Sequence, residues 1–263
     1  MLKRRIIPKI LVERRLIGST AHLVNVTTTS FAEARIVGDP VAQAKLFEAQ
    51  LADELMVLRI DSAHDEDDKG FIDLLIRLAT ETFMPLAVGG GVNDLGAAER
   101  LISSGADKVV VNAGALKAPL LISQIAHQFG AQSVVVSVDF RRAPDGVDRV
   151  ATGPGRNQLL MPVEEWVDTA VSLGAGEIML CDVDRDGHGS GLNLENARRI
   201  SQGLRTPLIL SGGCGTAEHF AEGYLEAGAD AVAAGTLFSR RDQTPMQVRA
   251  HVHNVGVPVR MIT

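Results

Sequence analysis

The chain has 263 residues, of which 46% are hydrophobic and 22% are charged, and its formal net charge at pH 7 is −6. This composition is ordinary for a globular protein, whereas the acidic balance and the single Trp and Tyr exclude the basic, aromatic surface of a nucleic-acid-binding protein. The sequence shows no secretory signal and no apolar stretch long enough to span a membrane, and Cys181 and Cys214 cannot build a disulfide framework. We therefore expect a cytoplasmic protein.

Short apolar runs alternate with amphipathic stretches along the whole chain. The runs that predict strands are 5–11, 55–60, 86–88, 108–111, 133–139, 177–181, 207–211 and 231–234. Helical patterns lie between them, for example over 41–51, 96–104, 120–129, 163–173 and 217–227. Apolar strands that alternate with helices favour a parallel sheet covered by helices. Eight such units predict an α/β fold, a (β/α)8 TIM barrel, rather than an open sheet.

An internal repeat supports the barrel. Ser211-Gly-Gly follows Val88-Gly-Gly by 123 positions, and the same offset relates Val183-Asp to Ile60-Asp and Ala234 to Val111. Matched strand ends at one offset predict two half-barrels of four units each, related by a two-fold repeat. No linker or low-complexity segment separates the halves, so we expect residues 1–263 to form a single domain.

Glycine-rich turns follow several predicted strands and precede helices. Gly89-Gly-Gly and Gly212-Gly have this position, and Asn112-Ala-Gly and Gly235-Thr end the next strand of each half. Such turns let backbone N–H groups approach a phosphate, with the positive end of a helix behind them. The repeat then predicts two phosphate sites on opposite sides of one barrel face. The alternative is that these glycines only form tight turns.

Carboxylates that end apolar strands are the candidates for acid–base chemistry. Asp139 closes the fifth predicted strand and should lie in the mouth of the barrel, where burial tends to raise the pKa of a carboxyl group. Its alternative is a structural carboxylate that caps backbone N–H groups. Asp184 and Asp186 fall in a polar loop after the sixth strand, where they could orient a sugar hydroxyl or cap the next helix.

Other polar residues carry weaker signals. The acidic run from His64 to Asp68 has no strong metal-ligand spacing, so we expect no metal site and no cofactor. His188 is interpreted as a solvated loop residue. Cys181 and Cys214 fall at neighbouring strand ends and are interpreted as buried, inert thiols.

A series of motifs runs almost end to end along the chain, in this order: Arg4-Arg-Ile-Ile-Pro, Gly38-Asp-Pro, Asp53-Glu-Leu, Val88-Gly-Gly-Gly, Gly105-Ala-Asp-Lys, Trp166-Val, Gly174-Ala-Gly-Glu-Ile, Asp184-Arg-Asp-Gly and Ser211-Gly-Gly. In these motifs the chain resembles the cyclase subunit of imidazole glycerol phosphate synthase, a barrel of histidine biosynthesis. The resemblance implies a bis-phosphorylated small-molecule ligand. It places the phosphate-binding positions at Gly91, Asn112, Gly187, Gly213, Gly235 and Thr236.

The resemblance also implies a glutaminase partner whose ammonia enters through the bottom of the barrel. The family's ring of four gating charges corresponds to Arg5, Glu54, Lys108 and Glu177, and Asp107 corresponds to an aspartate that faces the glutaminase. Two acids and two bases inside a barrel bottom have a second interpretation, namely an ion-pair network that only closes the core.

Two departures set this chain apart from the family. The family uses one aspartate at the end of strand one and one at the end of strand five; the second is Asp139, but Leu11 stands in place of the first. Arg59 replaces a further strand-two aspartate, with Asp61 two positions later. A hydrocarbon in place of a catalytic carboxylate should cost about 10²–10⁴-fold in rate. The sequence therefore argues against an efficient histidine-pathway cyclase.

Leucine at the strand-one position is similar to a paralogous branch of surface-polysaccharide synthesis, including lipopolysaccharide. Its members work with a glutaminase and a sugar amidotransferase that forms an acetamidino group, and Ala34-Arg-Ile-Val-Gly-Asp-Pro is also similar to that branch. Our leading hypothesis from the sequence is thus an ammonia-conducting subunit for amidination.

Two alternatives to amidination stay open, and with them the question whether the chain is an enzyme. The first is a lyase of the cyclase family in which Asp61 or Asp184 takes the lost role. The second is a non-catalytic scaffold that activates a glutaminase. The related isomerase that acts one step earlier also needs an aspartate where this chain has Leu11.

Overall fold

The structure, a computed structural model, describes residues 3–61, 69–153 and 157–260. The acidic run from His64 to Asp68 therefore lies outside the described residues. No helix in the described part of the chain is long and apolar enough to cross a membrane.

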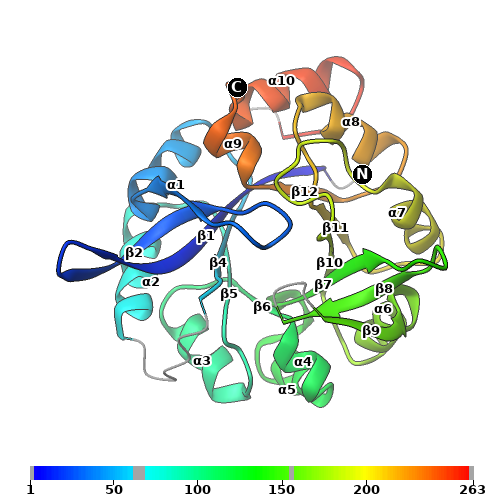
Figure 1. The fold of residues 1–263 in the computed structure, drawn as a ribbon, viewed down its shortest axis with the longest axis horizontal. Helices are drawn as coiled ribbons and strands as arrows, with labels where there is room; N and C mark the ends of the chain where they lie inside the picture. The colour runs from blue at the N-terminus through cyan, green and yellow to red at the C-terminus, as the bar shows by residue number, and fades with distance from the viewer. Residues whose placement is uncertain (1–2, 62–68, 154–156, 261–263) are drawn as a thin grey trace.

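Within these residues, parallel strands close into a barrel whose axis runs along the line of sight in Figure 1. The barrel strands are β1 (Arg5–Ile17), β4 (Leu55–Arg59), β5 (Leu86–Gly89), β6 (Lys108–Val111), β7 (Val134–Arg142), β10 (Glu177–Asp182), β11 (Leu208–Ser211) and β12 (Ala231–Ala234). Neighbours pair in this order, β12 pairs with β1, and β10 pairs with β7, so the ring is closed. The predicted (β/α)8 barrel is confirmed.

Helices surround the barrel in Figure 1 and cover its outer surface. They are α1 (Pro40–Ala49), α2 (Lys69–Glu81), α3 (Leu95–Ser103), α4 (Ala113–Lys117), α5 (Leu120–Phe129), α6 (Val163–Ser172), α7 (Leu194–Ser201), α8 (Ala217–Leu225), α9 (Thr236–Arg240) and α10 (Pro245–Asn254), with a 3₁₀ turn η1 (Ala131–Ser133). Helix starts carry the expected caps: the Asp39 and Asp94 side chains accept from backbone N–H groups, and Thr244 forms a capping box with Gln247.

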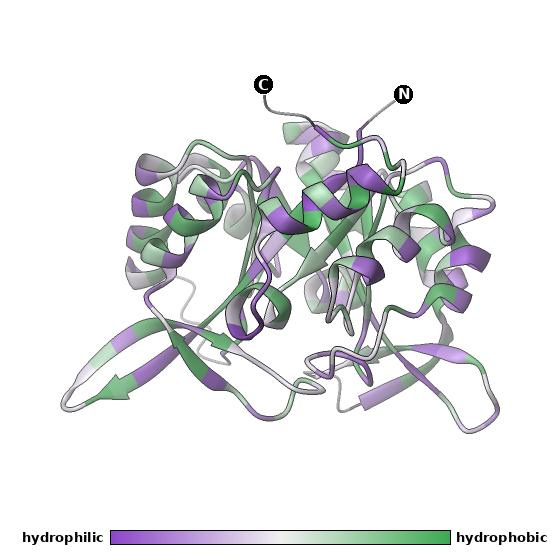
Figure 2. Cartoon of the chain, turned by 90° about the horizontal axis from the view of Figure 1, so that it is seen from above, coloured by the Kyte–Doolittle hydropathy of each residue, from purple (hydrophilic) through white to green (hydrophobic). Residues whose placement is uncertain are grey.

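Two antiparallel extensions were not predicted from the sequence. β1 and β7 continue beyond the barrel, where β1 pairs with β2 (Thr20–Thr27), which pairs with β3 (Arg35–Gly38), and β7 pairs with β8 (Asp148–Thr152), which pairs with β9 (Asn157–Pro162). Figure 2 shows both extensions at the barrel end opposite the chain termini. This end contains the carboxyl ends of the barrel strands, where active sites of such barrels lie.

The half-barrel repeat is visible in the strand order. β4, β5 and β6 lie four places around the ring from β10, β11 and β12, and β1 and β7, which both carry an extension, are also four places apart. The matched turns after β5 and β11 therefore lie on opposite sides of the barrel. This arrangement confirms the prediction drawn from the 123-residue offset.

Strand side chains alternate between the helices and the barrel interior, as the pleat requires. In β1, Ile6 and Ile10 belong to the large core shared with the helices, whereas Ile7 belongs to a second cluster inside the barrel. That inner cluster consists of Ile7, Met56, Ala87, Val110, Val135, Met179, Ile209, Ala231 and Ala233. Lys9 and Leu11 follow Ile7 at intervals of two, so they face the interior nearer the mouth.

Candidate active site

Asp139 lies at the barrel mouth, near the end of the interior run of β7. Its Oδ2 accepts a hydrogen bond from Asn112 Nδ2 at 2.7 Å, and Ser137 Oγ is 3.4 Å from its Oδ1. Asn112 follows β6 directly, and its side chain holds the Asp139 carboxylate, while the phosphate-binding role of this position stays a prediction. The backbone at Asn112 keeps its predicted place at the start of α4.

Asp186 is the second carboxylate of this site. It is buried, and its Oδ2 accepts a hydrogen bond from Thr28 Oγ1 at 2.7 Å. The backbone of the same loop is tied to the β2–β3 turn, because Ser30 N donates to the Asp186 carbonyl at 2.9 Å. The loop after β10 is thus held in place by the β1–β2–β3 extension, a contact that local sequence patterns do not reveal.

Lys9 completes the cluster, and it was not predicted from the sequence. This lysine is 5% exposed, and its Nζ donates to Ser211 Oγ at 3.0 Å and lies 3.8 Å from Asp186 Oδ1. The available signal was a charge inside the apolar run from Ile6 to Leu11, on the same face as Ile7 and Leu11. Lysine is almost never fully buried unless it is paired, so its place in that strand pointed to a buried partner.

The cluster shifts the ionisation of its members. Burial raises the pKa of Asp139 to about 6, although the Asn112 hydrogen bond and the Lys9 charge act in the opposite direction. Burial lowers the pKa of Lys9, but the negative groups around it, including Asp186 and Asp139, outweigh burial and leave that pKa raised. Near neutral pH the site therefore contains an ionised carboxylate with a pKa in the range of a general base, beside an ammonium group.

Leu11 lies beside this cluster and supplies no titratable group. Its side chain is 7% exposed and packs with Val24 and Val26 of β2 and with Leu58 of β4. The strand-one position that the resemblance associates with a catalytic aspartate is therefore part of an apolar wall, and any proton transfer near strand one falls to another residue.

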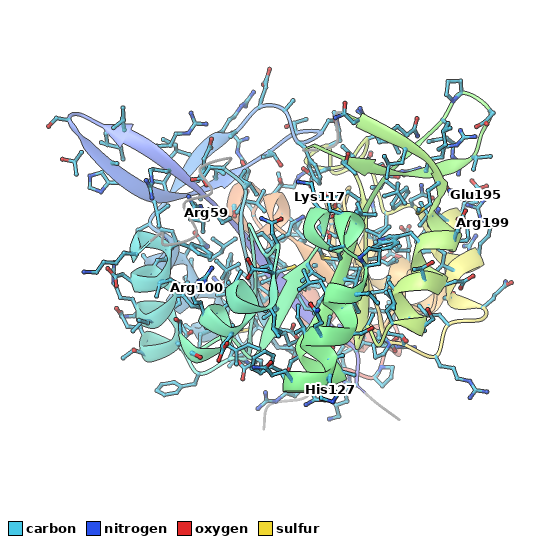
Figure 3. All side chains as sticks on the ribbon, turned by 90° about the horizontal axis from the view of Figure 1, so that it is seen from below. Arg59, Arg100, Lys117, His127, Glu195 and Arg199 are labelled. Carbon is cyan, nitrogen blue, oxygen red and sulfur yellow. The ribbon has the colours of Figure 1, made fainter. Side chains whose placement is uncertain are left out.

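Arg59 and Asp61 face away from the barrel interior. Arg59 Nε lies 2.5 Å from Asp61 Oδ1, and the guanidinium lies 5.9 Å from the centre of the Phe71 ring on α2. Asp61 Oδ2 also accepts from Arg14 N at 2.9 Å, at the base of the β1–β2 hairpin that lies above Arg59 in Figure 3. Arg59 therefore pairs on the helix side of β4 and does not face the mouth. Asp61 stays a predicted catalytic residue, but its oxygens are engaged in this pair.

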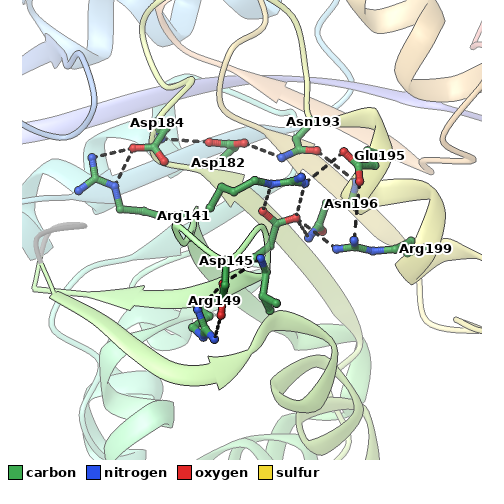
Figure 4. Close-up of polar contacts among 12 residues, drawn as sticks. Arg141, Asp145, Arg149, Asp182, Asp184, Asn193, Glu195, Asn196 and Arg199 are labelled. Carbon is green, nitrogen blue, oxygen red and sulfur yellow. Dashed lines mark hydrogen bonds and ion pairs between the residues drawn. The ribbon is translucent and has the colours of Figure 1, made fainter.

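Asp184 lies on the outer side of the same loop. It pairs with Arg141 of β7 at 2.7 Å, whereas the helix cap of α7 is Asn193, whose side chain accepts from Asn196 N. The Asp182 carboxylate accepts from the backbone N of Asp184 and from Asn193 Nδ2, as Figure 4 shows. Asp182 thus fixes the loop that presents Asp186, and Asp184 is directed away from the Asp139 cluster.

A buried carboxylate attaches the second extension to the barrel. Asp148 of β8 is fully buried and accepts from Arg142 at 2.9 Å and 3.0 Å, from Asn196 at 2.8 Å and from Arg199 at 3.2 Å. Burial raises the pKa of Asp148, but these hydrogen bonds and charges outweigh it and lower the pKa overall. The network makes β8 a fixed wall on one side of the mouth.

The glycine turns form the rim on two opposite sides. Gly91 follows β5 and Gly213 follows β11, while Gly235 and Thr236 follow β12. Gly187 lies in the loop after β10, where a Cβ would approach the Thr28 carbonyl oxygen to 2.1 Å, so only glycine fits against the extension. The predicted phosphate positions thus contribute backbone groups to the same rim, and their binding role stays a prediction.

Gly213 offers a direct test of the rim. Its φ is +96°, and an alanine Cβ there would lie 2.2 Å from the Gly191 carbonyl oxygen. We expect Gly213→Ala to lower the free energy of unfolding by more than about 1 kcal/mol and to weaken binding of a phosphorylated ligand. Thermal unfolding and calorimetric titration measure the two effects. Gly203→Ala is the control, because no atom lies within 4 Å of the added Cβ; equal behaviour of both variants would contradict the prediction.

Four charged side chains form a closed ring at the opposite end of the barrel. Arg5 lies 2.6 Å from Glu54 and 3.1 Å from Glu177, and Lys108 lies 2.8 Å from Glu54 and 2.9 Å from Glu177. Glu54 is 2% exposed, whereas the two cations are about one fifth exposed. The predicted ring members therefore come together, and the apolar inner cluster follows them along the barrel axis.

Asp107 lies at the same end of the barrel. Its side chain is exposed, and its Oδ2 accepts from Leu86 N at 2.9 Å, which links the start of β5 to β6. The carboxylate thus has a structural role and also faces the surface near the ring.

The cysteines are buried and free. Burial raises the pKa of both thiols, so neither is a ready nucleophile. Cys181 lies in the interior near Lys9, whereas Cys214 packs in the core shared with the helices. In the described residues, no group of three or more His, Cys, Asp or Glu side chains is arranged to hold a metal ion.

Comparison with known proteins places this geometry among histidine-biosynthesis barrels. A family model described as "Histidine biosynthesis protein" matches residues 5–244. The chain is 42% identical to the "Putative imidazole glycerol phosphate synthase subunit hisF2" of Prochlorococcus marinus, over 99% of both chains. It is 41% and 37% identical to the "Imidazole glycerol phosphate synthase subunit HisF" of Exiguobacterium sibiricum and of Alkaliphilus metalliredigens, over 99% of this chain and 100% of each relative.

Proposed function

Because the chain belongs to the histidine biosynthesis protein family, we propose that it is the ammonia-using cyclase subunit of an imidazole glycerol phosphate synthase. In this proposal it takes ammonia from a glutaminase at the ring end of the barrel. It uses the ammonia on a bis-phosphorylated ligand held by the glycine rim at the other end.

One observation carries the proposal: three layers follow one another along the barrel axis. The ring of Arg5, Glu54, Lys108 and Glu177 is the first, the apolar cluster around Ile7 and Met179 is the second, and the cluster around Asp139 is the third. An apolar passage suits a neutral molecule such as ammonia and disfavours ammonium ion, because a charge in that layer would lose its hydration. The acid–base group stands where such a passage would end.

The amidination hypothesis drawn from Leu11 loses its support. Relatives that match this chain over almost its full length are named as subunits of imidazole glycerol phosphate synthase, including the hisF2 protein at 42% identity. Leu11 remains a real departure, but Lys9 and Asp186 supply charged groups next to the position it occupies. The loss of one carboxylate therefore does not remove acid–base capacity from the site.

The partner surface would be the ring end of the barrel. Phe83, in the turn between α2 and β5 at this end, is 91% exposed, and a large exposed aromatic side chain is a typical interface anchor. We expect Phe83→Ser to weaken glutaminase binding about tenfold or more and to leave turnover with ammonium salt unchanged. Surface plasmon resonance measures glutaminase binding, and an assay with ammonium salt as the nitrogen source measures turnover. The exposed Leu160, in β9 at the opposite end, is the control; equal losses in Phe83→Ser and Leu160→Ser would contradict the assignment of the surface.

The function itself is tested with the purified chain and the synthase's bis-phosphorylated substrate. We expect turnover with ammonium salt alone, and turnover with glutamine once a cognate glutaminase is added. Growth of a histidine auxotroph that lacks its cyclase subunit should be restored. No turnover with either nitrogen source, together with stimulation of glutamine hydrolysis, would instead favour the scaffold interpretation.

A further inference from the structure

Lys9 is the charged residue of the mouth that the family resemblance does not explain. It lies two positions before Leu11 on the same face of β1, and its stem is enclosed at 5% exposure. Its ammonium is held by Ser211 Oγ at 3.0 Å and by Asp186 Oδ1 at 3.8 Å. Such a buried cation is costly unless its charge is used or fully paired.

The negative groups around Lys9 exceed the one positive charge it offers. The carboxylates of Asp186 and Asp139 face it, the first from the loop after β10 and the second from β7. Asp139 accepts hydrogen bonds from Asn112 and Ser137 and interacts with Lys9 through charge alone. The Lys9 ammonium therefore pairs with Asp186, and the Asp139 carboxylate remains available to accept a proton.

We infer that Lys9 is a catalytic residue, the proton donor that takes the place of the missing strand-one carboxylate, and that it acts with Asp139 as the base. This inference rests on the proposed function. The two groups come from opposite strands, β1 and β7, and lie at the mouth end of the apolar cluster inside the barrel. An acid and a base on opposite sides of a bound ligand is the arrangement that paired proton transfer needs.

The proton balance is simple when the acceptor carbon belongs to a carbonyl group. Ammonia attacks the carbon, an N–C bond forms, and the C=O π electrons move to oxygen. That oxygen takes a proton from the Lys9 ammonium, while the new nitrogen cation gives a proton to the Asp139 carboxylate. Transfer of the proton from Asp139 back to the Lys9 amine resets both groups, and the net change is addition of ammonia across the C=O bond.

Two variants separate a proton donor from a structural cation. Lys9→Arg keeps the positive charge, but a guanidinium does not give up its proton in a protein. Lys9→Met removes the charge and keeps the unbranched stem. With ammonium salt as the nitrogen source and no glutaminase, we expect kcat to fall about 10²–10⁴-fold in both, with a smaller change in KM.

The pH dependence adds a readout that folding defects do not mimic. Because the Lys9 charge lowers the pKa of Asp139, Lys9→Met should move the acidic limb of the kcat profile above pH 6, whereas Lys9→Arg should leave it in place. A ¹³C NMR titration of the Asp139 carboxyl reports the same shift without any substrate. The exposed Lys45 on α1 provides the control, and Lys45→Met should behave as the unaltered protein.

A double variant tests the replacement itself. Lys9→Met combined with Leu11→Asp returns a carboxyl group to the strand-one position, and we expect it to recover part of the kcat lost in Lys9→Met. Full kcat in Lys9→Arg would overturn the inference, as would an Asp139 pKa that is the same in Lys9→Met and the unaltered protein. If the unaltered protein gives no turnover, the proposed function fails, and the NMR titration still decides whether Lys9 and Asp139 are coupled.

Discussion

Asp139→Asn is expected to abolish ammonia-dependent turnover and to leave the fold intact or more stable. The amide cannot accept the proton that Asp139 takes, so kcat should fall about 10²–10⁴-fold. The fold should survive because the amide can keep a hydrogen bond with Asn112, which now donates to Asp139 Oδ2. Loss of activity without loss of stability would identify a catalytic group, whereas a scaffold would tolerate the substitution.

The stability of this variant should depend on pH in one direction. The pKa of Asp139 is about 6 in the folded protein against an ordinary value of 3.8, so folding opposes ionisation of this group. Below about pH 4 the carboxyl is protonated in both states, and the two proteins should be equally stable. As pH rises from about 4 through 6, Asp139 ionises more readily in the unfolded chain than in the folded protein, so the unaltered protein becomes less stable. Above pH 6, Asp139→Asn should therefore be more stable by about 1–2 kcal/mol, allowing for partial exposure of the side chain.

Chemical denaturation at pH 4.5 and pH 8, together with the kcat measurement, checks both parts. Asp168→Asn is the matched control, because Asp168 lies exposed on α6. Turnover retained in Asp139→Asn would show that Asp139 is not the base of the reaction.

The barrel could be predicted from the sequence because its signals are local. Each interior strand is a short apolar run, and the offset that relates Val88 to Ser211 reflects two equal halves. The extensions could not be predicted this way. β2 reads as a mixed polar segment, and β8 is held by Asp148, whose partners Asn196 and Arg199 lie on α7 about fifty positions later in the chain.

The same distinction applies to the site. Asp139 was predicted because a carboxylate at the end of an apolar strand has a fixed position in a barrel. Asp186 and Asp184 are two positions apart in one loop. Their roles differ because Asp186 contacts Thr28, in the segment between β2 and β3. Lys9 was not among the residues singled out from the sequence, although strand alternation turns it inward toward Ser211.

The second large effect is expected at the ring. The Glu54 Oε2 atom accepts from both Arg5 and Lys108, at 2.6 Å and 2.8 Å. In Glu54→Gln, Glu177 is the one carboxylate of the ring that remains to pair with these two cations. The new amide NH₂ group would lie where Glu54 Oε1 makes no hydrogen bond within the described residues. We expect a loss of about 1–3 kcal/mol in the free energy of unfolding, less than for a fully buried pair because the cations are partly exposed.

The functional effect of Glu54→Gln should appear only when ammonia comes from the partner. With one carboxylate lost, the four side chains no longer form a closed ring of ion pairs. Ammonia released by a glutaminase can then escape before it reaches the apolar cluster inside the barrel. The amount of glutamine hydrolysed per product formed should rise severalfold, while turnover with saturating ammonium salt stays near that of the unaltered protein. Glu81→Gln, which breaks the exposed pair with Lys45, is the control. If stability falls and coupling does not change, the four charges close the core without any part in ammonia transfer, and the partner half of the proposed function must be given up.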